Sequence, residues 1–498
     1  MKKKVTLLNM ISGLILQVCT IVSGFILPKI ILSVFGSEVN GLVSSLTQFL
    51  QYIALTEGGV TNVVMASLYK PIVEHDTKKL SAVLTTADAF FKKIGIVFIL
   101  YALGVSVVYP LVFRTGFSFA YVACLTIILA MNLFIRYMFS LTLKTLLTAD
   151  KKEFIVSLSQ AVIVVLNLLL AYVSVRIYPS IHLLKFISGL LFIIQPVLYS
   201  RYVRKHYSIN WHEERDTALI KNRWNGFAVN LAAFIHSSTD VTVLTIFTDL
   251  RTVSVYSVYT LISVNLKKLI NSCLSGISST VGHAYARKNW QELHEKMDVY
   301  EYLVFLMVFL VFTVACLLIT PFVQIYTKGI SDADYFRPTF GILILAAEAI
   351  YLLKVPHVSL AYNANKFREI TIPSFIEAGL NIGISVLLVP RYGLSGVAIG
   401  TVIAMTYRTM FHVYFTSTFI PDRPQRIFYR KFFLFLGCSL LSYFLCAFFF
   451  PMTTVSLLSW CLHGVLYTMI VGGILAGLSV AFFQKELRFF IQYLRRKK

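Results

Sequence analysis

The chain has 498 residues, of which 57% are hydrophobic, 14% aromatic and only 14% charged. Soluble domains have about 25% charged residues and disordered chains have few aromatic ones, so this composition excludes both classes. The 45 Lys and Arg residues outnumber the 23 Asp and Glu residues, giving a net charge of +22, which in a membrane protein first indicates basic cytoplasmic loops.

Runs of about 20 apolar residues predict transmembrane helices, because this length spans the hydrocarbon core of a bilayer. The chain has fourteen such runs, and no long polar domain interrupts them. In chain order they lie near residues 5–34, 41–67, 94–113, 118–143, 154–175, 182–200, 224–248, 253–282, 300–326, 338–362, 370–389, 394–419, 432–451 and 457–482. The sequence therefore predicts an all-α polytopic membrane protein.

The distribution of basic residues predicts the orientation. With the N-terminus in the cytoplasm, the inner segments hold 32 Lys and Arg residues and the outer loops hold six. Cytoplasmic loops are enriched in Lys and Arg, so we expect both termini on the cytoplasmic side. Seven basic residues remain inside the spans, and most of the net charge therefore reports topology rather than a partner.

Several features recur at an offset of about 215 residues, each at the same topological position. The matched sets are Asn9 and Asn225, Tyr69 and Tyr285, Ala149-Asp150-Lys151 and Ala364-Asn365-Lys366, and Asn167 and Asn381. We predict an N-terminal lobe over residues 1–205, a cytoplasmic linker over 206–222 and a C-terminal lobe over 223–420, followed by two further helices and a basic amphipathic tail over 421–498. Six spans per lobe give both lobes one orientation, and a substrate site is expected between them near the midplane.

Three short inner segments have an apolar face and are predicted to lie at the inner membrane interface. They cover residues 77–91, 286–299 and 484–494. The last is followed by Arg495-Arg-Lys-Lys498, which suits anionic headgroups.

Ionisable side chains at membrane depth are costly and usually face a bundle interior or a wet cavity. Lys267 lies on a polar stripe with gaps of three and four residues, which places its members on one helix face. The other members are Thr260, Ser263, Asn271, Ser275 and Ser278. We predict a cationic, substrate-binding site from Lys29, Arg136, Lys267, Lys268, Lys354 and Arg408. Lys268 points about 100° away from Lys267, so both cannot line one site equally.

Two details bear on this site. Lys29 follows Pro28, where the first helix is expected to kink. Glu348, Tyr351 and Lys354 share one helix face.

Four acidic residues also fall inside the spans, at Glu57, Asp240, Glu348 and Glu377. We expect these carboxylates to neutralise the empty site or to bind H⁺ or Na⁺. Seven basic residues against four acidic ones favour an anionic substrate. Phosphate groups are the common choice, because Arg and Lys bind them through charge-assisted hydrogen bonds.

Motifs of other protein classes are missing from the sequence. No P-loop, serine-hydrolase, zinc-protease or Cys/His pattern occurs, so we expect no catalytic residues, no metal and no cofactor beyond a coupling ion.

Three pairs of glycines have a spacing of four residues, which lets helices approach closely. The pairs are Gly379 and Gly383, Gly396 and Gly400, and Gly473 and Gly477.

Two stretches of sequence resemble a known family. Leu388-Val-Pro-Arg-Tyr-Gly393-Leu-Ser-Gly396-Val-Ala-Ile-Gly400-Thr401, preceded by Asn381, resembles the turn between the eleventh and twelfth helices of polysaccharide transporters. The run from Gly24-Phe-Ile-Leu-Pro28-Lys29 through Phe35-Gly-Ser-Glu-Val-Asn40 to Leu68-Tyr-Lys70-Pro71 is similar to the Gram-positive repeat-unit transporters. These belong to the multidrug/oligosaccharidyl-lipid/polysaccharide (MOP) exporter superfamily.

The resemblance covers the whole chain and implies a MATE-like fold with a Wzx-type flippase function. Such proteins move an undecaprenyl-diphosphate-linked oligosaccharide to the outer leaflet by alternating access, for capsule or other surface glycans. The resemblance also implies location in the plasma membrane of a Gram-positive bacterium. The implied partners are membrane lipids, a glycan polymerase and glycosyltransferases, with no nucleic acid.

Three alternatives stay open at this point. They are a drug/cation antiporter of the same fold, a lipid II flippase for peptidoglycan, and a membrane glycan polymerase. The antiporter would favour an acidic site, and the polymerase would need an external catalytic loop that the sequence lacks.

Overall fold

The computed structural model describes residues 2–57, 59–113, 115–215 and 227–489. Within these ranges the chain is almost entirely helical and forms no strand, which confirms the predicted all-α fold. It divides into two compact units. Unit 1 comprises residues 1–234 and 249–254, and unit 2 comprises residues 235–248 and 255–498.

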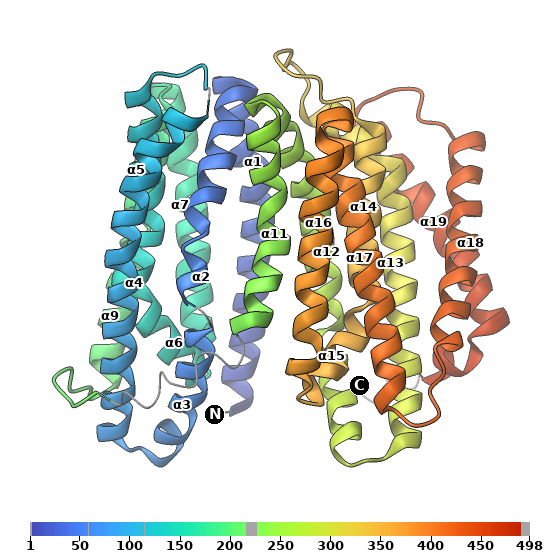
Figure 1. The fold of residues 1–498 in the computed structure, drawn as a ribbon, viewed down its shortest axis with the longest axis horizontal. Coiled ribbons are helices and arrows are strands. Elements are labelled where there is room, and N and C mark those ends of the chain that lie inside the picture. Colours follow the sequence, from blue (N-terminus) through green and yellow to red (C-terminus); the bar gives the residue numbers. More distant parts are fainter. Residues whose placement is uncertain (1, 58, 114, 216–226, 490–498) are drawn as a thin grey trace. The chain divides into compact units, whose positions relative to one another are not determined.

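The helices of unit 1 run mostly along one direction, with short connections at their ends (Figure 1). Their bounds are α1 Lys2–Gln51, α2 Ala54–Glu57, α3 Val60–Glu74, α4 Thr77–Val112, α5 Phe119–Ile135, the π-helix η1 Arg136–Ser140, α6 Leu141–Ala149, α7 Glu153–Ile177, α8 Ile181–Leu191 and α9 Ile194–His206. The first residues of α12 also belong to this unit, where Asn40 Nδ2 donates a 2.8 Å hydrogen bond to Ser254 Oγ.

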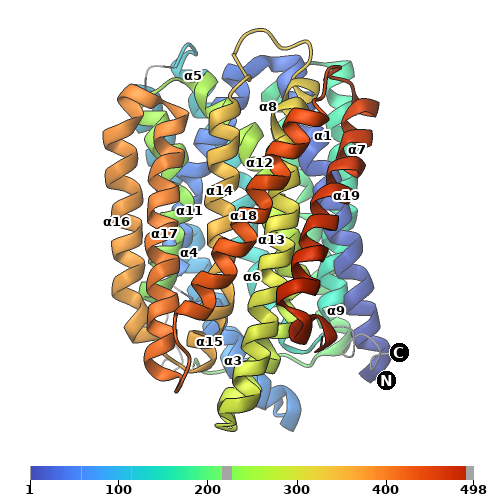
Figure 2. The same cartoon turned by 90° about the vertical axis from the view of Figure 1, so that its right-hand side faces the viewer.

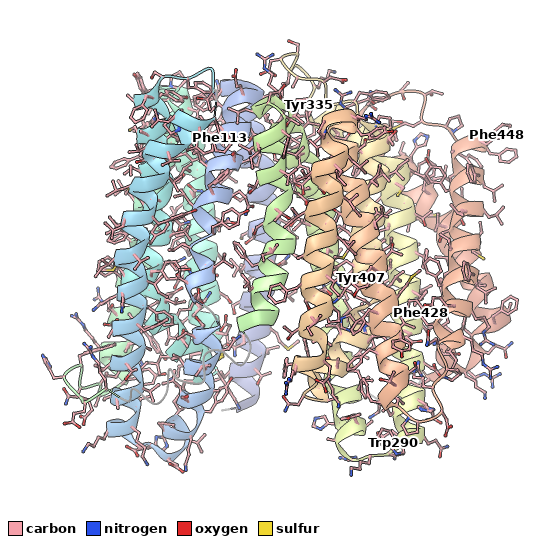
Figure 3. The ribbon with its side chains drawn as sticks, viewed as in Figure 1. Phe113, Trp290, Tyr335, Tyr407, Phe428 and Phe448 are labelled. Atoms are coloured by element: carbon pink, nitrogen blue, oxygen red, sulfur yellow. The ribbon has the colours of Figure 1, made fainter. Side chains whose placement is uncertain are left out.

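Unit 2 contains the second set of long helices. Their bounds are α11 Phe227–Phe247, whose first residues belong to unit 1, α12 Leu250–Ala286, α13 Trp290–Tyr326, α14 Pro338–Leu353, α15 Val355–Asn363, α16 Phe367–Tyr392, α17 Leu394–Phe419, α18 Arg426–Phe449 and α19 Leu457–Phe482. Trp290 and Tyr335 mark the two opposite ends of this unit (Figure 3). The last two helices, α18 and α19, both pack beside α13 (Figure 2).

Eleven helical segments of the described chain are long and apolar enough to cross a membrane. The first of them, Val5–Glu57, contains the first predicted span and most of the second. The helices α11 and α12 coincide with the seventh and eighth predicted spans but are not among the eleven. The polytopic architecture is therefore confirmed, while the count of fourteen spans remains a prediction.

The α1 helix has no break at Pro28, and its one non-helical residue lies between the first two predicted spans. The α1 helix continues through Pro28, and its backbone leaves helical geometry at Gly36, with φ 82° and ψ 177°. Glycine adopts this conformation without the steric cost that a Cβ would bring. Lys29 therefore lies in a stretch of α1 with helical backbone geometry.

The predicted interfacial segments are not separate helices. Residues 77–91 form the start of α4, and residues 290–299 form the start of α13, so each amphipathic segment continues directly into a membrane span. Their apolar faces pack against their own unit, since Leu80, Leu84 and Leu293 are buried. Of the third segment, residues 484–489 are helical and the remainder lies outside the described residues.

The two units share local features close to the predicted repeat offset. Asp76 and Asn289 each cap a long helix by accepting a backbone N–H three residues later, at 2.9 and 3.2 Å. His75 and Lys288, the residues just before these caps, both have a positive φ, of 56° and 55°. Such φ values are uncommon outside glycine, so their recurrence at matched positions supports two related lobes. The Asn9 and Asn225 match cannot be compared, because Asn225 lies outside the described residues.

Asn9 has a defined role in unit 1. Its Nδ2 donates to the carbonyl of Lys151 and its Oδ1 accepts from the backbone N–H of Phe154, both at 2.8 Å. It therefore holds the turn between α6 and α7, where Lys151 has a φ of 59°.

The three glycine pairs behave differently. A Cβ on Gly396 would lie 2.7 Å from the Leu388 carbonyl carbon, and a Cβ on Gly400 would collide with Ser385, so this pair allows the close packing of α16 against α17. Around Gly379, Gly383, Gly473 and Gly477 nothing lies within 4 Å of such a Cβ. The prediction of close approach is therefore correct for one pair and wrong for the other two, because spacing alone does not show whether a neighbouring helix faces the glycines.

Gly396→Ala is expected to destabilise unit 2 by about 1–3 kcal/mol, because the methyl group meets backbone that cannot move aside. Gly379→Ala is the matched control, since its methyl group meets open space and alanine is the better helix former. Thermal unfolding of the purified protein in detergent measures both. Equal unfolding temperatures for the two variants would contradict the assigned contact.

Candidate functional site

A cluster of charged side chains joins four helices of unit 2. We call it the central cluster; its members are Lys267, Glu348, Tyr351, Lys354, Glu377, Arg408 and His412. They come from the middle of α12, the second half of α14 and the residue after it, and from α16 and α17. Tyr407, the residue before Arg408, marks the level of the cluster along α17 (Figure 3).

The shortest ion pair in the central cluster joins α12 to α14. Lys267 Nζ lies 2.9 Å from Glu348 Oε1 and 2.8 Å from Oε2. The same ammonium lies 4.7 Å from the ring centre of Tyr351, and Lys354 Nζ lies 4.4 Å from that ring. Two ammonium groups therefore lie close to the ring of Tyr351, and the negative face of an aromatic ring attracts a cation.

The deeper half of the cluster surrounds Glu377. Its Oε2 lies 3.5 Å from Arg408 Nη1 and 4.0 Å from Lys354 Nζ. Arg408 Nε donates a 2.8 Å hydrogen bond to His412 Nε2, one helical turn further along α17. Because His412 accepts this bond, its ring is neutral at that nitrogen.

The charges of the central cluster do not cancel. Among its seven members three cations face two carboxylates, so with His412 neutral they carry a formal charge of +1, and one further carboxylate, Asp240, interacts electrostatically with Glu348. The side chains of Lys354, Glu377 and Arg408 are only 6–8% exposed, whereas Lys267 is 24% and Glu348 15% exposed. A buried excess of positive charge is costly, and an anion that reached the Lys267 side of the cluster would reduce this cost.

Asp240 forms a second polar group, which we call the Asp240 cluster, with Tyr256, Asn381 and Thr401. Tyr256 OH donates to its carboxylate at 2.9 Å, Asn381 Nδ2 at 3.2 Å and Thr401 Oγ1 at 3.3 Å. Thr401 Oγ1 also lies 3.2 Å from Asn381 Oδ1. Carboxylate, amide and hydroxyl oxygens thus converge from α11, α12, α16 and α17.

Unit 1 holds a smaller group around Glu57. Arg136 Nη2 lies 3.7 Å from Glu57 Oε2, and Tyr137 OH donates to the same oxygen at 3.3 Å. Thr61 Oγ1 donates to the other carboxylate oxygen. The π-helical turn η1 places Arg136 and Tyr137 toward α2, and such turns are frequent at functional sites.

The remaining predicted residues do not join these groups. Lys29 is half-buried in α1 of unit 1, and Lys268 is exposed on α12, on another face from Lys267. Along the polar stripe, Thr260 donates to the carbonyl of Tyr256, and Ser263 to that of Thr260. Asn271 is half-buried, and the Ser278 carbonyl accepts from Asn363. The side chain of Ser275 lies outside the described part. Hydrogen bonds of the stripe therefore stabilise α12 and its neighbours, and among the stripe residues whose side chains are described only Lys267 reaches the cluster.

One charged group was not predicted. We call it the α13–α18 ion cluster: Asp298, Glu301, His357, Arg423 and Lys431. Glu301 lies 2.7 Å from Arg423 Nη2 and 2.9 Å from Lys431 Nζ, and the side chains of Glu301 and Lys431 are each 1% exposed. The adjacent carboxylates Glu301 and Asp298 raise the pKa of the Arg423 guanidinium, in the loop before α18. Glu301 was outside the predicted site because it begins a span, and Lys431 because it lies next to basic loop residues.

Comparison with known proteins identifies solved structures that share this fold. No family model and no curated protein sequence matches the chain. Among solved structures, the inward closed form of the lipid II flippase MurJ superposes with a TM-score of 0.76 at 14% identity, covering 95% of this chain and all of that one. An inward-facing multidrug resistance MATE family transporter of the MOP superfamily gives a TM-score of 0.67 at 14% identity, covering 81% of this chain and 94% of that one.

A third structure is a MOP superfamily transporter from Pyrococcus furiosus, described by the reverse polarity of its binding pocket. It gives a TM-score of 0.59 at 13% identity and covers 84% of this chain and 97% of that one. The chain is therefore a multi-pass membrane protein with the fold of the MOP superfamily, which confirms the predicted MATE-like architecture.

Proposed function

We propose that this protein is a flippase that moves an undecaprenyl-diphosphate-linked oligosaccharide from the inner to the outer leaflet for surface glycan assembly. The observation that carries the proposal is the positive excess in the central cluster of a chain with the MOP fold. A diphosphate cannot cross hydrocarbon unaided, because removing its charge from water is prohibitive. Buried Lys and Arg side chains inside the bundle lower that barrier.

The proposed mechanism is alternating access of the two lobes. Lys267, the most exposed cation of the central cluster, receives the diphosphate first, and Lys354 and Arg408 add positive potential behind it. The cell interior is negative, so each negative charge that moves outward gains about 2.3 kcal/mol per 100 mV. The membrane potential therefore favours export without ATP, in keeping with a secondary transporter rather than an enzyme.

The likeness to a lipid II flippase and to multidrug transporters defines the two alternatives. A transporter of cationic drugs would be expected to carry an acidic excess, whereas the central cluster has a positive one. A lipid II flippase shares the diphosphate and differs only in the sugar, so charge does not separate it from our proposal.

A reconstitution experiment separates the three functions. Purified protein in liposomes is given, in parallel, a lipid-diphosphate oligosaccharide repeat unit, lipid II and a cationic dye. We expect the repeat unit to reach the outer leaflet fastest. Faster exposure of lipid II would reassign the sugar specificity, and dye efflux without lipid exposure would refute the flippase proposal.

We further propose that the Asp240 cluster binds the coupling ion, H⁺ or Na⁺. Three side chains from α12, α16 and α17 lie within hydrogen-bond distance of the carboxylate, and oxygen atoms are the ligands that hard cations prefer. Among the described residues, no group of three or more His, Cys, Asp or Glu side chains could hold a metal ion, so the amide and hydroxyl oxygens would have to complete such a site.

Asp240→Asn is expected to remove the response of flipping to an imposed ion gradient, because asparagine keeps the size of the side chain but not its charge. The assay measures leaflet exposure in proteoliposomes under a pH gradient and, separately, under a Na⁺ gradient. The gradient that accelerates lipid flipping by the unsubstituted protein identifies the coupling ion. An Asp240→Asn variant that responds as strongly as the unsubstituted protein would disprove this role.

A further inference from the structure

Unit 1 contains a large groove along the sides of α5, η1 and α9. Its volume is about 1250 Å³. This exceeds the size usual for pockets of small soluble ligands, about 300–1000 Å³. The groove is separate from the Glu57 group, whose residues do not line it.

The groove arises from irregularities in two neighbouring helices. Near Gly189 the helices are in close contact, since a Cβ there would lie 3.2 Å from Met131 Cβ. Beyond this point α8 ends at Leu191 and α9 begins at Ile194, while α5 gives way to the π-helical turn η1. Interruptions of this kind bend helices, and the groove opens along these altered segments.

One face of α9 changes from apolar to basic along this groove. Val197 lines its apolar part, with Phe134 and Phe139 on the opposite wall. Arg201, Arg204 and Lys205 line its end, at spacings of three and four residues that keep them on the same face as Val197. All three are exposed.

The charge at this end is unbalanced. None of the residues that line the groove is acidic. Within the described part of the chain, no carboxylate forms an ion pair with Arg201, Arg204 or Lys205. The positive-inside distribution assigns this end of α9 to the cytoplasmic surface. The groove therefore offers an apolar channel at membrane depth and, at the interface, a cationic end that no described carboxylate pairs with.

We propose that this groove binds an anionic phospholipid of the cytoplasmic leaflet, distinct from the transported substrate. Its phosphate lies against Arg201, Arg204 and Lys205, and an acyl chain lies along Val197, Phe134 and Phe139. The match is one of charge and polarity, since basic pockets between transmembrane helices on the cytoplasmic side suit anionic headgroups. A zwitterionic phospholipid offers the same chains but no net charge to the three cations.

The test is native mass spectrometry of the full chain with phosphatidylglycerol and phosphatidylcholine of identical acyl chains. We expect the protein to retain phosphatidylglycerol preferentially, and R201Q/R204Q/K205Q to lower that preference by about 100-fold. The control R426Q/R430Q/K485Q removes the same charge from exposed positions at the start of α18 and after α19, and it should keep the preference.

Three results would overturn this assignment. One is equal retention of both lipids by the unsubstituted protein, and another is equal loss of preference in the two triple variants. The third comes from a competition experiment, in which undecaprenyl phosphate and added phosphatidylglycerol each displace the bound phosphatidylglycerol. If undecaprenyl phosphate does so at the lower concentration, the groove is a site for the carrier lipid. Val197→Trp, which fills the apolar part, should lower retention of phosphatidylglycerol even with the three cations intact.

Discussion

Lys267→Ala is expected to lower the rate of lipid-diphosphate flipping by about 10- to 100-fold, the effect of losing a charge-assisted hydrogen bond to the substrate. Lys267 is the cation of the central cluster with the greatest exposure, at 24%, so it is the one that an entering anion meets. The rate is measured in proteoliposomes, with the amount of folded protein checked by size-exclusion chromatography. Lys185→Ala is the control, since it removes a half-buried lysine of α8 in unit 1.

A charge exchange distinguishes substrate binding from a purely structural ion pair. K267E/E348K keeps an ion pair between α12 and α14 but moves the cation to the other helix. If Lys267 binds the substrate, the double variant flips the lipid-diphosphate more slowly than the unsubstituted protein. Full recovery of the rate would show that the Lys267 and Glu348 contact only stabilises the bundle, and the assignment of Lys267 would be wrong.

Glu301→Ala is expected to destabilise the protein by about 3–5 kcal/mol, the usual cost of removing one partner from a buried ion pair. The substitution leaves Arg423 and Lys431 buried beside each other, with Asp298 as their one remaining ion-pair partner among the described residues. Since Lys431 belongs to α18, we also expect this helix to detach from α13. Unfolding by denaturant in detergent measures the first effect, and protease sensitivity of residues 420–425 measures the second.

Asp298→Ala is the matched control for this stability effect. Asp298 contacts the same two cations, but its side chain is 32% exposed and water can replace it. We expect a loss of about 1 kcal/mol or less, as for exposed ion pairs. Equal losses for Asp298→Ala and Glu301→Ala would show that burial does not set the strength of this cluster.

The sequence predicted the helices well, because hydropathy depends on local composition. The predicted span 394–419 coincides with α17, and 457–482 coincides with α19. Deviations occur where tertiary contacts decide the backbone. The π-helical turn at Arg136 is such a deviation, and no residue spacing indicates it, whereas the break at Gly36 falls between the predicted spans 5–34 and 41–67.

The candidate site was predictable only as a set of residues. Lys267, Glu348, Glu377 and Arg408 stand out as charges at membrane depth, but their pairing joins positions about 30 to 80 residues apart in the chain. Helix packing decides which carboxylate meets which cation. Lys268 illustrates this limit, since it has the same charge as Lys267 and differs only in the face that it presents. His412 could have been found from its spacing of four residues after Arg408.

The central claim, that this MOP-fold protein exports a lipid-linked diphosphate, is tested most directly by one measurement. Proteoliposomes carry an imposed membrane potential, negative inside, and the exposure of a labelled lipid-diphosphate oligosaccharide at the outer leaflet is followed over time. We predict exposure that depends on the protein, increases with the potential and falls in Lys267→Ala. Exposure no faster than in protein-free liposomes, with a cationic dye transported in the same vesicles, would contradict the account.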